Sequence, residues 1–390
     1  MNRFEFMNKT KLVAGDNALF QLDFECSRYH IKKALILTDN NLVKLKVVNH
    51  CLQHLTIPYY IYDNIPVDSS VYTINEIASL YEVNQCDGII AIGGGSVLDS
   101  AKGAYLLLSQ ETNSLEDIVG FEAVFKGKEI PFFAIPTTSG TGSEATSVAV
   151  ISHPDKNIKM EIISEYIQSD VTFLDPLMTL SLPLKTTIFT AIDALTHAIE
   201  AYSCSGKNPI SDIYATSAIS LIIENIHQII EHPNDKNIRL NLAIASYLAG
   251  CAFSNSMVGI VHGIGHALGA VCHIPHGEAM AMLLIPCMKF NKDVCIDWYG
   301  ELLLYIGGSE LYATTPIHQR ANKTIECLET LLYSLNMKIS SNCSLTSIKS
   351  LKDNLDDIIE KAMNDGAMIV NKKNVSYDDV YNILGGKYGY

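Results

Sequence analysis

Short apolar runs alternate with helical stretches along the first half of the chain. Four such runs, Ala34–Thr38, Tyr59–Tyr62, Gly88–Ile92 and Phe132–Ile135, are each followed by Gly, Pro or Asp. Apolar runs of this length, bounded by turn residues, are typical of buried strands, and strands that alternate with helices form parallel sheets. The pattern therefore predicts an α/β fold, with a Rossmann-like parallel sheet that carries helices on both faces.

The pattern changes between Leu174 and Pro183, where LDPLMTLSLP contains two prolines. Beyond this point the helical periodicities are long and strand-like runs are few. We therefore predict two domains, an α/β domain over residues 1–180 and an all-helical domain over residues 181–390.

One stretch of the helical half, Leu240–Gly277, carries no Asp, Glu, Lys or Arg. A membrane hairpin would explain this composition, but the histidines, asparagines and glycines of the stretch would be penalised in hydrocarbon. A helix that is buried on every side also has no solvent-facing stripe to carry charge. We therefore predict core helices here and no membrane span.

The charge balance narrows the choice of partners. The chain has 28 Lys and Arg against 42 Asp and Glu, a net charge of -14, which repels nucleic acid and anionic membranes. The ten cysteines show no CxxC pair, and the N-terminus has no long apolar run typical of a secretory signal. These features indicate a reducing compartment, and we expect a cytoplasmic enzyme.

A glycine turn follows the third apolar run. In GIIAIGGGSVLDSAKG we predict a strand over Gly88–Ile92, a turn over Gly93–Gly95 and a helix from Val97 onward. Such a turn presents backbone N–H groups and the positive end of a helix to a phosphate, and glycine lets the ligand approach closely. The segment does not match G-x-G-x-x-G, because Leu98 occupies the third glycine position, so a plain tight turn is the alternative.

Two further strand ends carry polar residues. After FFAI, the loop that starts at Pro136 contains Thr137 and Thr138, whose hydroxyls could line a nucleotide or cap their own turn. Asp39 follows the first strand, where a carboxylate could bind an adenosine ribose and repel a 2′-phosphate, or could form a turn. Because these loops and the glycine turn lie at carboxyl ends of parallel strands, we predict a shared dinucleotide site that favours NAD(H).

Histidines and one aspartate in the helical half indicate a metal site. Asp193 and His197 are four residues apart in AIDALTHAIEAY, and His262 and His266 repeat this spacing, so that each pair shares a helix face. His276 follows a proline turn. One carboxylate and several imidazoles suit Fe²⁺ or Zn²⁺. Any single histidine could instead be a hydrogen-bonded core residue, and spacing alone does not choose between His266, His276 and the nearby His273 as the third imidazole.

The motifs GGGSVLDSAK, IPTTSGTGSEAT, DALTHAIEAY, FSNSMVGIVHGIGHALGA and IPHGEA together resemble the iron-containing (group III) alcohol dehydrogenases. This family includes lactaldehyde reductase and 1,3-propanediol dehydrogenase. The resemblance extends from about Thr38 to Asn291, with the motifs in the family's order and spacing. It implies the fold of the family, an N-terminal nucleotide domain joined to an all-helical metal-binding domain, an architecture that dehydroquinate synthase shares.

The resemblance also implies roles for individual residues. It implies one divalent metal, Fe²⁺ before Zn²⁺, and places His266 near the nicotinamide and substrate without binding the metal, where it could relay the alcohol proton to solvent. His273 falls at no ligand position. The implied metal ligands are Asp193, His197, His262 and His276. The residues implied around the dinucleotide are Asp39, Gly94, Gly95, Ser96, Asp99, Thr137, Thr138 and Lys159.

The expected reaction is hydride transfer between NAD(H) and a small primary alcohol or its aldehyde, in a homodimer or larger homo-oligomer. One alternative within the same architecture is a reductase of small anionic aldehydes, sulfonated or phosphonated. Another is a zinc-dependent polyol dehydrogenase similar to glycerol dehydrogenase, although such relatives typically use fewer histidine ligands. A non-catalytic metal-binding helical protein is the alternative outside enzymes, and it would leave the strand-end loops without a ligand.

Overall fold

The structure, a computed structural model, describes residues 3–110, 112, 114–115, 126–156, 158–341 and 343–385. The chain divides into two compact units. The sheet unit comprises Met7–Leu182 and Asn234–Gly250, and the helical unit comprises Met1–Phe6, Pro183–Pro233 and Cys251–Tyr390.

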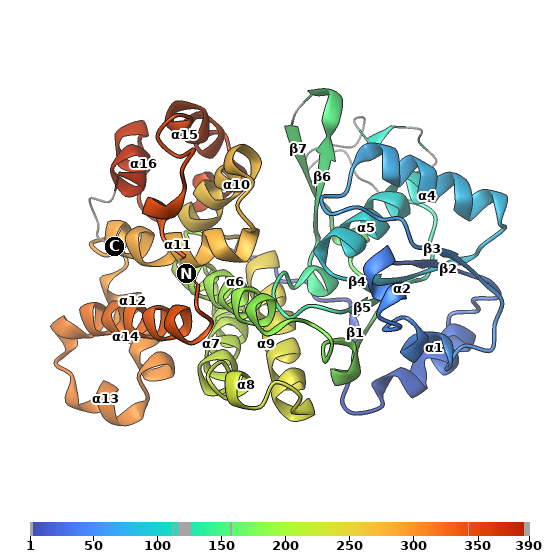
Figure 1. Ribbon diagram of the computed structural model, residues 1–390, viewed down its shortest axis with the longest axis horizontal. Coiled ribbons are helices and arrows are strands. Elements are labelled where there is room, and N and C mark those ends of the chain that lie inside the picture. The colour runs from blue at the N-terminus through green and yellow to red at the C-terminus, as the bar shows by residue number, and fades with distance from the viewer. Residues whose placement is uncertain are drawn as a thin grey trace. The chain divides into compact units, whose positions relative to one another are not determined.

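A six-stranded sheet forms the centre of the sheet unit (Figure 1). Its strands are all parallel and lie in the order β1-β8-β5-β4-β2-β3. This confirms the predicted parallel sheet, and the four predicted runs correspond to β2, β3, β4 and β5. The sequence patterns singled out neither β1 nor β8. The strands are β1 Lys11–Ala14, β2 Ala34–Leu37, β3 Tyr59–Tyr62, β4 Gly88–Gly93, β5 Phe132–Pro136 and β8 Val171–Leu174.

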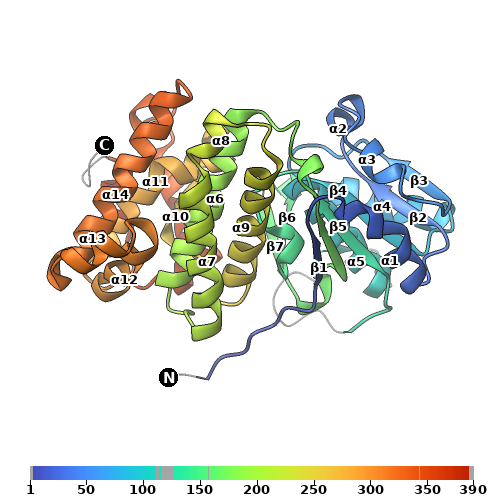
Figure 2. The same cartoon turned by 90° about the horizontal axis from the view of Figure 1, so that it is seen from below.

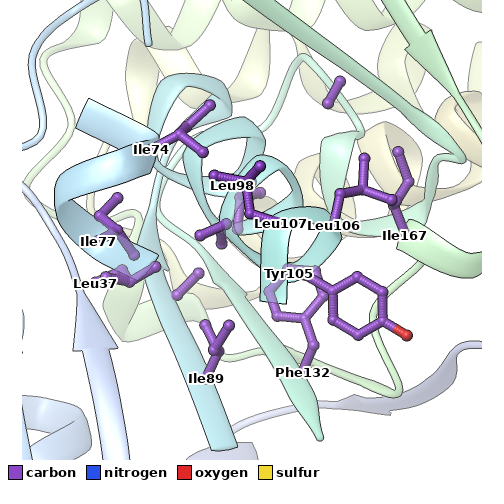
Figure 3. Packing of buried hydrophobic residues seen from close by; sticks show 14 of the residues in the cluster. Leu37, Ile74, Ile77, Ile89, Leu98, Tyr105, Leu106, Leu107, Phe132 and Ile167 are labelled. Atoms are coloured by element: carbon purple, nitrogen blue, oxygen red, sulfur yellow. The ribbon is translucent and has the colours of Figure 1, made fainter. Parts of the chain in front are cut away.

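Helices cover both faces of this sheet because successive strand residues point in opposite directions. In β4, Ile89 and Ala91 pack in the core against α4 and α5, whereas Ile90 and Ile92 belong to the core on the other face. Figure 3 shows the first of these cores, with Leu98 and other α5 residues packed over the strands. The helices of this part of the unit are η1 Ala18–Gln21, α1 Leu22–Arg28, α2 Asn40–Lys44, α3 Asn49–Leu52, α4 Val71–Val83 and α5 Gly95–Gln110.

A two-stranded antiparallel hairpin, β6 Val148–His153 and β7 Ile158–Ile163, follows β5 in the chain. The buried side chains of β6 alternate with partly exposed ones, as expected for a ribbon with one face on a core. Short 3-10 turns lie between β5 and α6: η3 Ser143–Ala145 before β6, η4 Pro154–Lys156 between β6 and β7, η5 Glu165–Ile167 before β8 and η6 Pro176–Met178 after β8.

The helical unit contains no strand among its described residues, in agreement with the predicted all-helical second half. Figures 1 and 2 show α6 and α7 side by side, and α12 packed along α14. The end of α9 belongs to this unit, whereas its first fifteen or so residues belong to the sheet unit. The helices are α6 Leu184–Ser203, α7 Pro209–Asn225, α8 Gln228–Glu231, α9 Lys236–Ser254, α10 Ile260–Cys272, α11 His276–Asn291, α12 Ile296–Ile306, α13 Ser309–Thr314, α14 Ile317–Lys338, η7 Leu345–Ser347, α15 Leu355–Met363, η8 Gly366–Val370 and α16 Tyr377–Leu384.

The uncharged stretch of the sequence forms most of α9 and α10. From Ile260 to Leu268 every residue of α10 is buried except His266, as predicted for a core helix. Within the described chain, one segment, Pro209–Glu231, is long and apolar enough to cross a membrane. Core helices of globular proteins also meet this criterion. This segment is interrupted between α7 and α8, and its Asp212 pairs with Lys207 at 2.7 Å.

Candidate functional site

Three helices bring the four predicted metal ligands together. Asp193 and His197 lie one turn apart on α6, His262 lies on α10, and His276 is the first residue of α11. One ligand atom from each of the four residues lies within 4.8 Å of the others. The Oδ1 atom of Asp193 is 3.2 Å from His276 Nε2, 3.7 Å from His262 Nε2 and 3.8 Å from His197 Nδ1.

These atoms are buried and lack the partners that buried polar atoms normally have. Asp193 Oδ1, His197 Nδ1 and His262 Nε2 make no hydrogen bond within the described part of the chain. Leaving such atoms unpaired costs about 1–3 kcal/mol each. Donors around a tetrahedral metal, at about 2.1 Å from the ion, lie about 3.4 Å from one another. The spacing around Asp193 Oδ1 therefore fits a single cation.

A metal needs neutral imidazoles and an ionised carboxylate. Burial lowers the pKa of His197 to about 3, so that its imidazole is neutral at physiological pH. Burial acts to raise the pKa of Asp193, but the imidazoles of His197 and His276 outweigh it and hold this pKa well below its usual range. Burial acts to lower the pKa of His262, but the carboxylates of Asp193 and Glu200 outweigh it and raise this pKa to about 9, so that metal binding displaces a proton from this imidazole.

Ring stacking fixes the orientation of the buried imidazoles. The ring of His197 stacks on Phe253 from α9, with centroids 4.3 Å apart and an interplanar angle of 14°. The ring of His197 also stacks on the ring of His262, with centroids 4.3 Å apart and an interplanar angle of 25°. His276 is the most exposed of the four, with 39% of its side-chain surface accessible. The cluster is thus rigid on the α6 side and open to solvent at His276.

The two histidines that spacing could not separate from the ligands occupy different positions. His266 lies one turn after His262, and its Nδ1 is 2.8 Å from Asp365 Oδ2. Its ring stacks beside His276, with centroids 5.5 Å apart. His273 is exposed and has a left-handed backbone (φ 54°) that ends α10, so that the chain can turn into α11. His273 is outside the His/Asp cluster.

In the sheet unit, the glycine turn and the threonine loop lie side by side because β4 and β5 are neighbours. Thr137 N donates to Gly93 O at 3.1 Å. A Cβ on Gly94 would lie 3.2 Å from Thr138 Cγ2, and one on Gly95 would lie 3.0 Å from a methyl group of the same loop. Glycine therefore leaves room for the threonine side chains of this loop beside the start of α5, and helix starts are typical anion-binding positions.

Asp39 lies two residues after the end of β2 and is the N-cap of α2. Its Oδ1 accepts hydrogen bonds from Asn41 N at 2.8 Å and Leu42 N at 3.0 Å. These bonds fix the carboxylate at the carboxyl edge of the sheet and use only one of its two oxygens. The cap is the turn role that the sequence offered as the alternative, and the ribose role stays a prediction.

The remaining residues expected at the dinucleotide make contacts within the protein. Lys159 Nζ lies 3.0 Å from Asp68 Oδ1, and the backbone N of Asp68 donates to Ser96 Oγ at 3.2 Å. Lys159 is thereby placed beside the glycine turn. Asp99 accepts hydrogen bonds from Ser143 Oγ at 2.7 Å and from a β6 backbone N–H, so it links α5 to the loop after β5.

The sequence analysis missed several buried ionisable residues near these sites. Lys102 is fully buried on α5 and donates to Ser143 Oγ, Thr146 Oγ1 and Val148 O at 2.7–3.0 Å. Burial raises the pKa of Glu144, in the threonine loop, to about 7. Glu200 lies on α6 and contacts a ligand histidine. Two spacings in the sequence could have indicated these residues. Lys102 follows Asp99 by three residues, and Glu200 follows Asp193 by seven, so that each pair shares a helix face.

Comparison with known proteins agrees with this fold and cluster. Residues 9–176 match the family described as iron-containing alcohol dehydrogenase, and residues 187–388 match its C-terminal family. Alcohol dehydrogenase 4 of Saccharomyces cerevisiae is 32% identical over 388 residues, which cover 96% of both proteins. The NAD-dependent methanol dehydrogenase of Bacillus methanolicus is 30% identical over 375 residues, 95% of this chain and 96% of the relative.

Among solved structures, a 1,3-propanediol oxidoreductase superimposes with a TM-score of 0.93 at 28% identity, over 98% of this chain and 99% of the other. The two matched family regions together cover nearly the whole chain, and the His/Asp cluster falls in the second of them. The chain therefore belongs to the iron-containing alcohol dehydrogenase family and is an NAD(P)-dependent oxidoreductase of this type.

Proposed function

We propose that the protein interconverts a small primary alcohol and its aldehyde by hydride transfer with NAD(H). The observation that supports this most strongly is the convergence of three buried, unpaired ligand atoms on one point, from Asp193, His197 and His262. We assign His276, whose Nε2 also faces Asp193, as the fourth ligand. The site is accessible on the side of His276, and a four-ligand site that expands to five-coordinate could bind the substrate oxygen there.

The donor set favours Fe²⁺, with Zn²⁺ as the alternative, because three imidazoles and one carboxylate suit either ion and the family is iron-containing. When bound, the cation supplies a Lewis acid that stabilises negative charge on the substrate oxygen. His266 lies one turn from His262 and is our candidate for moving the alcohol proton to and from solvent. Metal analysis of protein purified without air would identify the ion.

The dinucleotide is assigned to the α/β domain, residues 1–180, and the metal to the helical domain, residues 181–390. The backbone N–H groups at Gly94, Gly95 and Ser96 would hold the diphosphate, with Lys159 supplying positive charge. Thr137 and Thr138 would line the same site. Asp99 would act through the loop that it holds in place.

Replacing Asp39 with Ser is expected to shift cofactor preference towards NADPH by about 10- to 100-fold in the ratio of kcat/KM values. The reason is that serine still caps α2 but no longer repels a 2′-phosphate with a like charge. Steady-state kinetics with both cofactors would measure the ratio. A parent enzyme that uses NADPH as efficiently as NADH would refute the role of Asp39, and an unchanged melting temperature would show that the cap is intact.

We further propose that the enzyme acts in the cytoplasm as a homodimer or larger homo-oligomer. A substrate panel tests the main proposal: primary alcohols, diols, lactaldehyde and anionic aldehydes are offered to metal-loaded protein, and NADH is followed by absorbance. Consumption of NADH with short neutral aldehydes is expected to exceed that with anionic ones, because the chain's net charge of -14 opposes anionic substrates. No consumption with any aldehyde would overturn the proposal.

A further inference from the structure

Glu200 shares a face of α6 with two of the assigned metal ligands. It follows Asp193 by seven residues and His197 by three, so that the three side chains project from the same side of the helix. Glu200 is 5% exposed, and a carboxylate at that depth is stable only when its oxygens are paired. Both of its oxygens are paired, and both partners belong to the first turn of α10.

One oxygen determines which nitrogen of His262 can bind a metal. Glu200 Oε2 lies 2.5 Å from His262 Nδ1, and an ionised carboxylate can only accept a hydrogen bond. His262 therefore carries a proton on Nδ1. Its Nε2 is the nitrogen that can give a lone pair to a metal, and it lies 3.7 Å from Asp193 Oδ1 with no hydrogen bond to any described residue.

The other oxygen caps the helix that carries His262. Val261 N donates to Glu200 Oε1 at 2.8 Å, which satisfies one of the N–H groups left unpaired at the start of α10. The N-cap residue is Gly259, which has no side chain to do this. A Cβ at Gly259 would lie 3.0 Å from Glu200 Oε1, so glycine allows the carboxylate to come close.

The neighbouring N–H group is capped in a similar way from another part of the chain. Ile260 N donates to Asn371 Oδ1 at 3.3 Å. The amides of Asn371 and Asn291 exchange two hydrogen bonds of 2.9 and 3.0 Å. The start of α10 is therefore held by Glu200 from α6 and by Asn371 after η8, which Asn291 of α11 orients in turn, and of these three side chains only Glu200 also contacts a ligand histidine.

We infer that Glu200 is a positioning residue that builds the metal site: it selects the metal-binding tautomer of His262 and fixes α10 against α6. The inference rests on the proposed ligand set. Carboxylates behind ligand histidines typically strengthen metal binding by about 10- to 100-fold. Glutamine cannot replace Glu200, because its single oxygen can accept from Val261 N or from His262 Nδ1 but not properly from both, and its NH₂ group would face a donor.

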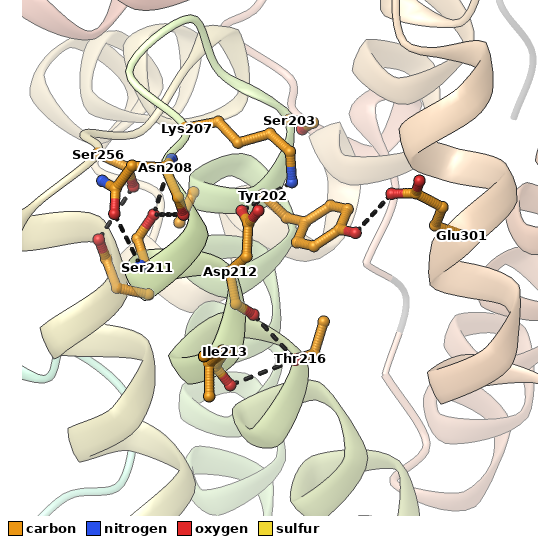
Figure 4. A network of polar contacts seen from close by, with 12 residues as sticks. Tyr202, Ser203, Lys207, Asn208, Ser211, Asp212, Ile213, Thr216, Ser256 and Glu301 are labelled. Atoms are coloured by element: carbon orange, nitrogen blue, oxygen red, sulfur yellow. Dashed lines mark hydrogen bonds and ion pairs between the residues drawn. The ribbon is translucent and has the colours of Figure 1, made fainter. Parts of the chain in front are cut away.

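The test measures metal binding directly, with Co²⁺ as a coloured probe. Metal-free parent, Glu200→Gln and Glu301→Gln proteins are titrated with Co²⁺ in competition with a chelating dye. Glu301 is the matched control, because this glutamate also accepts a hydrogen bond from α6, from Tyr202 at 2.6 Å (Figure 4). Tyr202 follows Asp193 by nine residues, which places it on the opposite face of the helix. The expected Kd is about 10- to 100-fold weaker for Glu200→Gln and unchanged for Glu301→Gln.

A second variant separates positioning from general loss of structure. Glu200→Gln is repeated in a His262→Asn background, where a residue that acts through His262 should cause little further loss of Co²⁺ affinity. Equal losses in the two backgrounds would overturn the inference, as would a Glu200→Gln Kd within twofold of the parent value. If Glu200→Gln does not fold, Glu200→Asp replaces it, because aspartate keeps two acceptor oxygens. Glu200→Asp is expected to fold and to bind Co²⁺ more weakly than the parent. Parent-like Co²⁺ binding by Glu200→Asp would overturn the inference. Failure of the parent to bind Co²⁺ would instead count against the proposed function.

Discussion

Removal of the metal is expected to lower kcat by at least about a thousandfold. Several kcal/mol of stabilisation of the charge on the substrate oxygen would be lost, and about 4 kcal/mol corresponds to this factor. His197→Ala should have a similar effect, because it removes a donor that is buried against Phe253 and cannot be replaced by another side chain. The measurement is NADH turnover by protein that has been dialysed against a chelator and assayed for residual metal.

Two controls make this result specific. Adding Fe²⁺ back without air should restore turnover to the dialysed parent but not to His197→Ala. His273→Asn should behave as the parent does, because His273 is exposed, lies outside the cluster, and has a left-handed backbone that asparagine tolerates. Full turnover in protein verified to be free of metal would end the proposal of a metal-dependent reaction.

His266→Ala is expected to lower kcat by about a hundredfold while metal affinity stays near the parent value. Proton transfer by a positioned side chain typically contributes 10² to 10⁴ in rate, and we take about the lower end because solvent can also reach the site. Asp365 accepts from His266 Nδ1 at 2.8 Å, which holds the ring in one orientation. Turnover and Co²⁺ binding would be measured on the same preparation.

Imidazole in the buffer should recover part of the lost rate in His266→Ala, since it can enter the space that the side chain vacates. Asp365→Asn should show a smaller loss than His266→Ala, because it loosens the ring without removing it. A His266→Ala enzyme with parent-like kcat would show that the proton leaves by another route. A parallel loss of Co²⁺ affinity would show instead that His266 supports the metal site.

Much of the fold could be predicted because local sequence patterns determine where many of the strands and helices form. The fully apolar strands β2, β4 and β5 lie inside the sheet and were recognised with nearly their observed bounds. β1 was not recognised, because it forms the edge of the sheet and alternates between partly buried and exposed positions. The hairpin after β5 was also missed. Segment Asn234–Gly250 belongs to the sheet unit, which no local pattern indicates.

For the candidate site, the sequence by itself determined the groups that lie one turn apart. Asp193 and His197 had to share a face of α6, and the glycine turn had to follow a buried strand, because helix and strand geometry fixes neighbours within a few residues. The resemblance to a family then supplied the fourth ligand. Spacing alone left His266, His273 and His276 equivalent.

Only the tertiary structure decided which of these side chains meet. It brings His276 Nε2 to 3.2 Å from Asp193, turns His266 towards Asp365, and places Glu200 behind His262. Each of these contacts joins helices far apart in the chain. Their geometry depends on how whole helices pack, and the packing is set by the combined burial of many apolar side chains and not by the local order of residues.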